Sequence, residues 1–150
     1  MRDGRVIENS WRGIPTKVSC AIIERDNKIL AARRGAAQSQ AGLWEFPGGK
    51  LDCGETAAQA LIRELKEELG IEIIPKTPLT PVIHTYPSIT IELIPFISHI
   101  LSGEPFQREH SEIMWIEPRS ALNLEWAPAD IPVVKEYISR GAARSAPAYY

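Results

Sequence analysis

The chain has 150 residues, 44% of them hydrophobic, with 17 Lys and Arg against 19 Asp and Glu. This length suits one domain with a substantial core and is short for two. The formal net charge of -2 and the lack of long runs of like charge argue against a nucleic-acid or membrane surface. We therefore expect a single domain that binds neither nucleic acid nor a membrane.

The N-terminal segment, residues 1–15, carries several charged residues and no apolar stretch, so we interpret it as an extension without a secretory signal. A cytoplasmic protein is the resulting expectation. The two cysteines agree with it, because Cys20 and Cys53 show neither CxxC spacing nor histidine companions and are expected to be free thiols.

Segments rich in Val, Ile and Leu, separated by turn-forming residues, predict strands along most of the chain. They are Lys17–Ile23, Lys28–Arg34, Val82–Tyr86, Ile89–Ile100 and Ile113–Ile116, with a shorter apolar segment at Leu43–Phe46. Asp26 and Asn27, between the first two segments, predict a tight hairpin turn. Pro75, Pro78 and Pro81 predict a connector outside the strands.

One helix is clearly marked at Thr56–Leu69, where apolar residues recur every three or four positions. Thr56 followed by Gln59 predicts a capping box, and Gly70 predicts a left-handed C-terminal cap. The other expected elements are a helical turn at Pro118–Leu122, a last helix at Ile131–Arg140 and a mobile tail at residues 141–150. This order predicts an α/β or α+β fold over residues 16–140, with a mixed sheet between helices.

Three carboxylates share one side of the predicted helix, because Glu64, Glu67 and Glu68 are three and four positions apart. Like charges at this spacing destabilise an isolated helix by about 0.2–0.5 kcal/mol per pair, and a divalent cation would offset the repulsion. Magnesium prefers oxygen ligands and also binds phosphate oxygens. The alternative is that these glutamates only solvate the outer face of an amphipathic helix, with Arg63 paired to Glu67.

The spacing of residues on both sides of the helix start is more specific than the helix face alone. The chain contains the pattern Gly-x5-Glu-x7-Arg-Glu-x2-Glu-Glu-x-Gly, occupied by Gly49, Glu55, Arg63, Glu64, Glu67, Glu68 and Gly70. Seven fixed identities at roughly 7% each would coincide with a probability on the order of 10⁻⁸ per starting point. The pattern matches the Nudix hydrolase signature, and the chain resembles that family from about Thr16 to Arg140.

This resemblance implies a Nudix fold in which the signature forms a loop-helix-loop at a metal-dependent site. In the family, the glutamates that match Glu64, Glu67 and Glu68 bind divalent ions or activate water. The carbonyl of the glycine matching Gly48 is often a further ligand, and the arginine matching Arg63 orients the glutamates. The implied cofactor is Mg²⁺, for which Mn²⁺ is a substitute.

A glutamate from a later loop serves some relatives as base or metal ligand. The segment Gly103–Glu109 offers Glu109 for this role, and Glu112 is its nearest competitor. The alternative is that Glu109 is an ordinary charged residue on a surface loop. Spacing alone does not decide whether Glu64 or another glutamate takes the proton.

The flanking segments Leu43–Lys50 and Trp126–Pro132 resemble the MutT-like branch, which includes bacterial CTP pyrophosphohydrolases and acts on free nucleoside triphosphates. In that branch the residue matching Asp130 meets the Watson–Crick edge of the base. The residues matching Glu45–Gly48 line the nucleotide site, and the arginine matching Arg34 contacts the phosphates.

Asp130 is therefore the expected base-reading residue. An ionised Asp accepts hydrogen bonds only, which suits the amino group of cytosine, whereas a protonated Asp could accommodate a purine with O6. The alternative is that Asp130 simply caps the last helix. Trp44, Phe46 and Tyr86 are candidates for stacking on the base, although tryptophans in a small domain more often serve the core.

Together these residues predict Mg²⁺-dependent hydrolysis of a nucleoside or deoxynucleoside triphosphate to the monophosphate and pyrophosphate. Cytidine nucleotides and oxidised purines such as 8-oxo-dGTP are the expected substrates, and nucleotide-pool sanitation the expected role. One alternative is hydrolysis of ADP-ribose, a nucleotide sugar or a dinucleoside polyphosphate. Another is a non-catalytic nucleotide sensor, which the intact set of signature glutamates disfavours.

Overall fold

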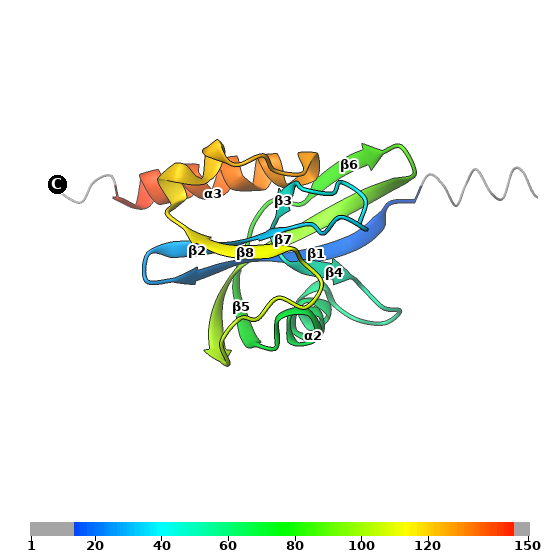
Figure 1. Cartoon of the computed structure of the whole chain (residues 1–150), viewed down its shortest axis with the longest axis horizontal. Coiled ribbons are helices and arrows are strands. Elements are labelled where there is room, and N and C mark those ends of the chain that lie inside the picture. Colours follow the sequence, from blue (N-terminus) through cyan, green and yellow to red (C-terminus); the bar gives the residue numbers. More distant parts are fainter. Residues whose placement is uncertain (1–13, 146–150) are drawn as a thin grey trace, which may run out of the picture.

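A computed structural model describes residues 14–145, with side chains through residue 141. It contains an eight-stranded mixed sheet between two helical layers, as Figure 1 shows. The strands are β1 (Thr16–Arg25), β2 (Lys28–Arg33), β3 (Trp44–Glu45), β4 (Gly48–Lys50), β5 (Glu72–Pro78), β6 (Val82–Tyr86), β7 (Ile89–Ser102) and β8 (Glu112–Ile116). The α-helices are α2 (Ala57–Leu69) and α3 (Ile131–Ser145), and the 3-10 helices are η1 (Pro118–Asn123) and η2 (Pro128–Asp130).

The sheet is built around strands β1 and β7, which run parallel to each other. The main strand order is β3-β2-β1-β7-β5, while β4 pairs with β1, β6 with β7 and β8 with β2. All pairs other than β1 with β7 are antiparallel. The predicted mixed sheet is thus confirmed.

Strand β1 supplies buried residues to both faces of the sheet because successive side chains point in opposite directions. Cys20 and Ile22 belong to the core cluster that includes Val133 and Val134 of α3. Ala21 belongs to the opposite cluster, with Leu61, Leu65 and Leu69 of α2. The two helices therefore cover opposite faces of one sheet, which is the sandwich that the sequence predicts.

Turn and cap residues act as the sequence predicts. Asp26 and Asn27 both have positive φ, 52° and 63°, as the hairpin between β1 and β2 requires. Thr56 and Gln59 form the capping box of α2. Gly70 adopts the left-handed conformation at the C-cap of that helix.

The structure differs from the sequence prediction in the proline-containing connector. Residues Glu72–Pro78 form strand β5, which pairs with β7 and contains two register shifts, one of them between Pro75 and Thr77. A proline lacks the backbone N–H that a central strand needs, but β5 is the last strand in the main order and tolerates it. Edge position and irregular pairing therefore explain why the prediction was wrong.

Helix α3 also continues to Ser145, beyond the predicted end at Arg140. The remaining predicted tail, residues 146–150, and most of the predicted N-terminal extension, residues 1–13, lie outside the described residues. Among residues 14–145, no helix is long and apolar enough to cross a membrane.

Candidate active site

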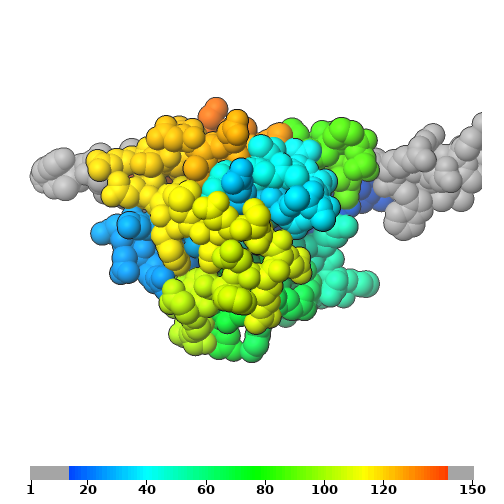
Figure 2. All heavy atoms as spheres, viewed as in Figure 1, coloured from blue at the N-terminus to red at the C-terminus, as the bar shows by residue number. Residues whose placement is uncertain are grey.

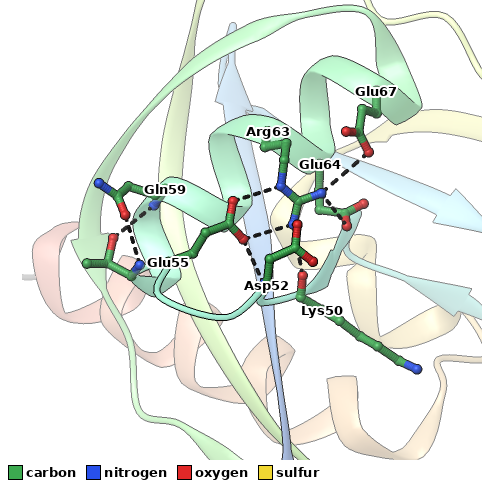
Figure 3. Close-up of polar contacts among 8 residues, drawn as sticks. Lys50, Asp52, Glu55, Gln59, Arg63, Glu64 and Glu67 are labelled. Carbon is green, nitrogen blue, oxygen red and sulfur yellow. Dashed lines mark hydrogen bonds and ion pairs between the residues drawn. The ribbon is translucent and has the colours of Figure 1, made fainter.

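Arg63, in the middle of α2, ties the signature loop to the helix, as Figure 3 shows. Its Nε and Nη2 donate to the two carboxylate oxygens of Glu55 at 2.8 and 2.9 Å. Nη2 also donates to the carbonyl of Lys50 at 3.1 Å, and Nη1 donates to Glu64 Oε2 at 3.1 Å. The carboxylate of Glu67 lies 3.5 Å from Nη1. Arg63 therefore orients the loop and two of the predicted metal ligands at once.

The charge of this arginine changes the acidity of its partners. Hydrogen bonds from Arg63, and then from the backbone N–H of Asp52, lower the pKa of Glu55 from 4.5 to about 2. The pKa of Arg63 is raised in turn, chiefly by its bond to Glu55. Glu55 therefore stays ionised and holds the guanidinium in place.

Gly48 and Gly49 bring the loop backbone into contact with both β1 and α2. Strand β4 pairs with β1, where Gly48 lies opposite Cys20 and Gly49 opposite Ser19. A Cβ at Gly48 would overlap the carbonyl of Ser19, and a Cβ at Gly49 would overlap the carboxylate of Glu64. Glycine is therefore required at position 48 for the pairing with β1 and at position 49 for Glu64 to pack against the loop.

The acidic side of α2 concentrates negative charge. The pKa of Glu68 is raised from 4.5 to about 9, first by burial and then by the charges of Glu64, Glu45 and Glu109. Glu67 is more open, with 60% of its side chain exposed. The predicted ligands Glu64, Glu67, Glu68 and Glu109 thus lie on one side of the protein around the Gly48 loop.

These carboxylates have the hard oxygen donors that a divalent cation takes. In the part of the chain that the structure describes, however, no three His, Cys, Asp or Glu side chains converge closely enough to hold an ion as they stand. Glu64 and Glu67 both contact Arg63 instead. The donor set fits a cation by its chemistry, and each of these two carboxylates has a second oxygen beyond the one that contacts the arginine.

The structure separates Glu109 from its competitor Glu112. Glu109 is exposed in the loop between β7 and β8, and its charge contributes to the raised pKa of Glu68. Glu112 instead begins β8 and lies 3.7 Å from Nη1 of Arg33. Of the two, Glu109 is the one that shares the electrostatic environment of α2.

A cleft of about 720 Å³ extends from the acidic cluster to the predicted base-reading residue. Gly48, Gly49 and Glu68 line one part of it, and Phe46 and Asp130 line another. The β6–β7 hairpin contributes further lining residues, Tyr86, Pro87, Ser88 and Ile89. One continuous cavity thus joins residues that are far apart in sequence.

Asp130 is only 5% exposed, and its Oδ2 accepts a hydrogen bond from the backbone N–H of Phe46 at 2.9 Å. Its pKa is raised well above the ordinary value, first by burial and then by the charge of Glu45. Asp130 is the last residue of η2, which runs directly into α3. The Asp130 side chain therefore bonds the segment just after β3 instead of the first turn of α3.

The aromatic candidates have different positions. Phe46 lines the cleft, and its ring centroid lies 4.7 Å from that of Trp126. Tyr86 also lines it, and its hydroxyl oxygen accepts a hydrogen bond from Ala129 N at 3.0 Å. Trp44 is 8% exposed and belongs to the core cluster on the α3 side, outside the cleft lining. The structure thus places Trp44 in the core and outside the lining of the cleft.

Arg34 and Glu45 lie in the cleft, but they bind each other. Nη1 of Arg34 donates to Glu45 Oε1 at 2.7 Å, and Nε donates to the carbonyl of Ser39 at 2.5 Å. The other carboxylate oxygen of Glu45 lies 2.9 Å from Nε2 of His110. Sequence reasoning missed His110 because a lone histidine beside Glu109 in a polar loop carries no spacing signal.

With this geometry established, comparison with known proteins identifies the family. The family model of the NUDIX domain matches residues 14–137. The chain belongs to the Nudix hydrolase family. It is an enzyme of a family whose members use divalent metal ions, and the predicted Nudix fold is confirmed.

Individual relatives cover nearly the whole domain. The chain is 42% identical over 130 residues to the CTP pyrophosphohydrolase of Escherichia coli (strain K12), covering 87% of this chain and 96% of that protein. It is 32% identical to the 8-oxo-dGTP diphosphatase of the same organism, covering 79% and 92%. Among solved structures, the E. coli ORF135 protein has a TM-score of 0.76 at 42% identity, covering 88% and 94%.

The Glu55–Arg63 pair predicts a specific acid sensitivity. Because the folded pKa of Glu55 lies below its ordinary 4.5, the pair stabilises the fold above pH 4.5 and the stabilisation is lost as pH falls toward 2. Urea unfolding between pH 5 and pH 3 should therefore show a shallower loss of stability in Glu55→Gln than in the wild type. Glu117→Gln, which alters an exposed pair with Arg119, serves as control. Equal pH slopes in wild type and Glu55→Gln would contradict the role of the pair.

Proposed function

We propose that this Nudix hydrolase converts a nucleoside or deoxynucleoside triphosphate into the monophosphate and pyrophosphate, in nucleotide-pool sanitation. The observation that carries the proposal is the shared cleft, in which Glu68 lies at the acidic end and Asp130 at the other. A triphosphate needs cationic compensation at one end and hydrogen bonding to its base at the other. The named activities of the relatives, a CTP pyrophosphohydrolase and 8-oxo-dGTP diphosphatases, support the same reaction class.

The proposed cofactor is Mg²⁺, for which Mn²⁺ is a substitute. Glu64, Glu67, Glu68, Glu109 and the carbonyl of Gly48 are the residues that would hold it. When bound, such an ion polarises a phosphoryl oxygen and makes a water more acidic. The negative charge that raises the pKa of Glu68 is the kind that a divalent cation neutralises.

The protein's own part in the reaction is to orient the carboxylates and to receive a proton. Arg63 fixes the loop through Glu55 while contacting Glu64. Glu64, packed on Gly49, and the exposed Glu109 are the two proposed acceptors for the proton of the attacking water. Arg63 does not fully neutralise Glu64, because the same guanidinium also pairs with Glu55 and Glu67.

Arg34 also lines the cleft and is proposed to contact the phosphates, while Glu45, Phe46 and Asp130 are proposed to contact the nucleoside at the end away from the metal. Arg34 is 22% exposed and retains unshared guanidinium hydrogens beyond its bonds to Glu45 and Ser39. Phe46 supplies an apolar wall beside Asp130, whose Oδ2 is fixed by the Phe46 N–H.

Cytidine nucleotides are the first proposed substrates, and 8-oxo-dGTP is the second. The raised pKa of Asp130 favours a neutral carboxyl, which has a hydroxyl donor as well as an acceptor. A neutral Asp130 can pair with N3 and the amino group of cytosine, and it can also donate to O6 of an oxidised guanine. The burial of Asp130, which favours its neutral form, is thus the reason why 8-oxo-dGTP stays among the proposed substrates.

A substrate panel tests the proposal. Purified protein with Mg²⁺ is expected to release pyrophosphate from CTP, dCTP or 8-oxo-dGTP with a higher kcat/KM than from ADP-ribose, a nucleotide sugar or a dinucleoside polyphosphate. Chelation with EDTA should abolish the release, and excess Mg²⁺ should restore it. Binding of these nucleotides with no release from any of them would favour the sensor function instead.

The metal assignment predicts the effect of neutral substitutions on α2. Glu67→Gln and Glu68→Gln should each lower kcat by orders of magnitude because each removes an anionic oxygen ligand. Glu72→Gln is the matched control, since Glu72 bonds Lys66 and Ser102 outside the cluster. Circular dichroism would establish that all three variants fold. Near-normal turnover in both cluster variants would refute the assignment.

The base-reading assignment predicts a change in selectivity at Asp130. Asp130→Asn keeps the size and the acceptor for the Phe46 N–H but replaces the acid hydroxyl with an amide. We therefore expect the ratio of kcat/KM values for dCTP and 8-oxo-dGTP to change while the melting temperature stays close to that of the wild type. An unchanged ratio would remove Asp130 from substrate recognition.

A further inference from the structure

His110 is a buried side chain within an exposed loop. Its side chain is 2% exposed, whereas its neighbours Arg108, Glu109 and Ser111 are all exposed. Figure 2 shows the segment around residue 110, in yellow, packed beside the segment around residue 40, in cyan. A hydrogen bond of 2.9 Å from Ser111 N to the carbonyl of Arg33 also joins this segment to the end of β2. The imidazole is therefore held inside the protein by a well-anchored backbone.

The contact of His110 in this interior is the carboxylate of Glu45. Nε2 lies 2.9 Å from Glu45 Oε2, and both residues line the cleft. A carboxylate accepts hydrogen bonds only, so Nε2 is the donor. Arg34 donates to the other oxygen at 2.7 Å, so Glu45 is held from two sides by segments far apart in the chain.

Glu45 lines the cleft within electrostatic reach of both of its ends. Its charge raises the pKa of Glu68 at the acidic end and the pKa of Asp130 at the base end. Each carboxylate oxygen can accept more than one hydrogen bond, so the bonds to Arg34 and His110 leave room for a donor from a ligand. Ribose hydroxyls and exocyclic amino groups are the nucleoside groups with that chemistry.

From this geometry we infer that His110 is a positioning residue for nucleotide recognition, holding the Glu45 carboxylate so that it accepts a hydrogen bond from the nucleoside. The inference rests on the proposed function. It differs from a purely structural role for His110, in which the side chain would only anchor the loop and any substitution that keeps the fold would leave nucleotide affinity unchanged.

The geometry of the donor separates these two roles. The amide nitrogen of Gln falls near the place of Nε2 in His, whereas that of Asn falls near Nδ1, which has no hydrogen-bond partner among the described residues. His110→Gln therefore keeps the donor for Glu45, and His110→Asn removes it. His99→Asn is the matched control, because His99 makes a comparable 3.1 Å contact with Glu24 outside this cleft.

The experiment measures kcat and KM for the best substrate of the panel, and the Kd of its α,β-methylene analogue by calorimetry. His110→Asn should raise KM and Kd about tenfold, a loss of about 1.4 kcal/mol, with kcat changed less than about twofold. His110→Gln should stay within about threefold of the wild type, and His99→Asn should behave as the wild type. In a Glu45→Gln background, His110→Asn should add no further loss, because the two residues act as a unit.

The opposite results overturn the inference. Equal effects of His110→Gln and His110→Asn, unchanged affinity in both, or full additivity with Glu45→Gln would each show that His110 does not act through Glu45. If His110→Asn fails to fold, Glu45→Gln must still raise KM with little change in kcat. Hydrolysis by the wild type with unaffected His110 variants overturns only this inference, whereas a wild type that neither hydrolyses nor binds nucleotides overturns the proposed function as well.

Discussion

The close approach of the Gly48–Gly49 backbone to β1 and to Glu64 is the constraint on which the site depends. No side chain fits at either glycine, so the loop can lie flat between the sheet and α2. That position lets Arg63 reach Glu55, Glu64 and the carbonyl of Lys50 together. Glu68 of α2 then lines the cleft, and burial raises its pKa.

Three acidic side chains, Glu45, Glu68 and Asp130, line the cleft and favour ligands that bring positive charge or hydrogen-bond donors. Glu68 and Asp130 both have raised pKa values, and burial is the first cause in each case. Glu45 acts on both groups, and its own carboxylate is held by Arg34 and His110. A nucleotide accompanied by a divalent cation satisfies both requirements, with the cation beside the phosphates and the donors on the nucleoside.

Local chemistry made much of this structure predictable. The capping residues of α2, the turn at Asp26 and Asn27, and the signature spacing all act within short segments, so the sequence alone indicates them. The positions of Trp44 and His110 depend on long-range packing, which the sequence alone does not show. Trp44, next to Glu45, belongs to the core. His110, in a polar loop, is buried against Glu45. The pKa of Asp130 likewise depends on burial by segments far away in the chain, which spacing does not encode.

Strand β5 has a consequence for how molecules of this protein behave toward one another. A regular strand at the end of a sheet offers a row of free backbone groups to a neighbouring molecule, and pairing there can propagate into aggregates. Pro75 and Pro78 carry no backbone N–H, and the register shifts make the spacing of backbone groups along β5 irregular. This irregularity makes β5 a poor template for intermolecular sheet growth.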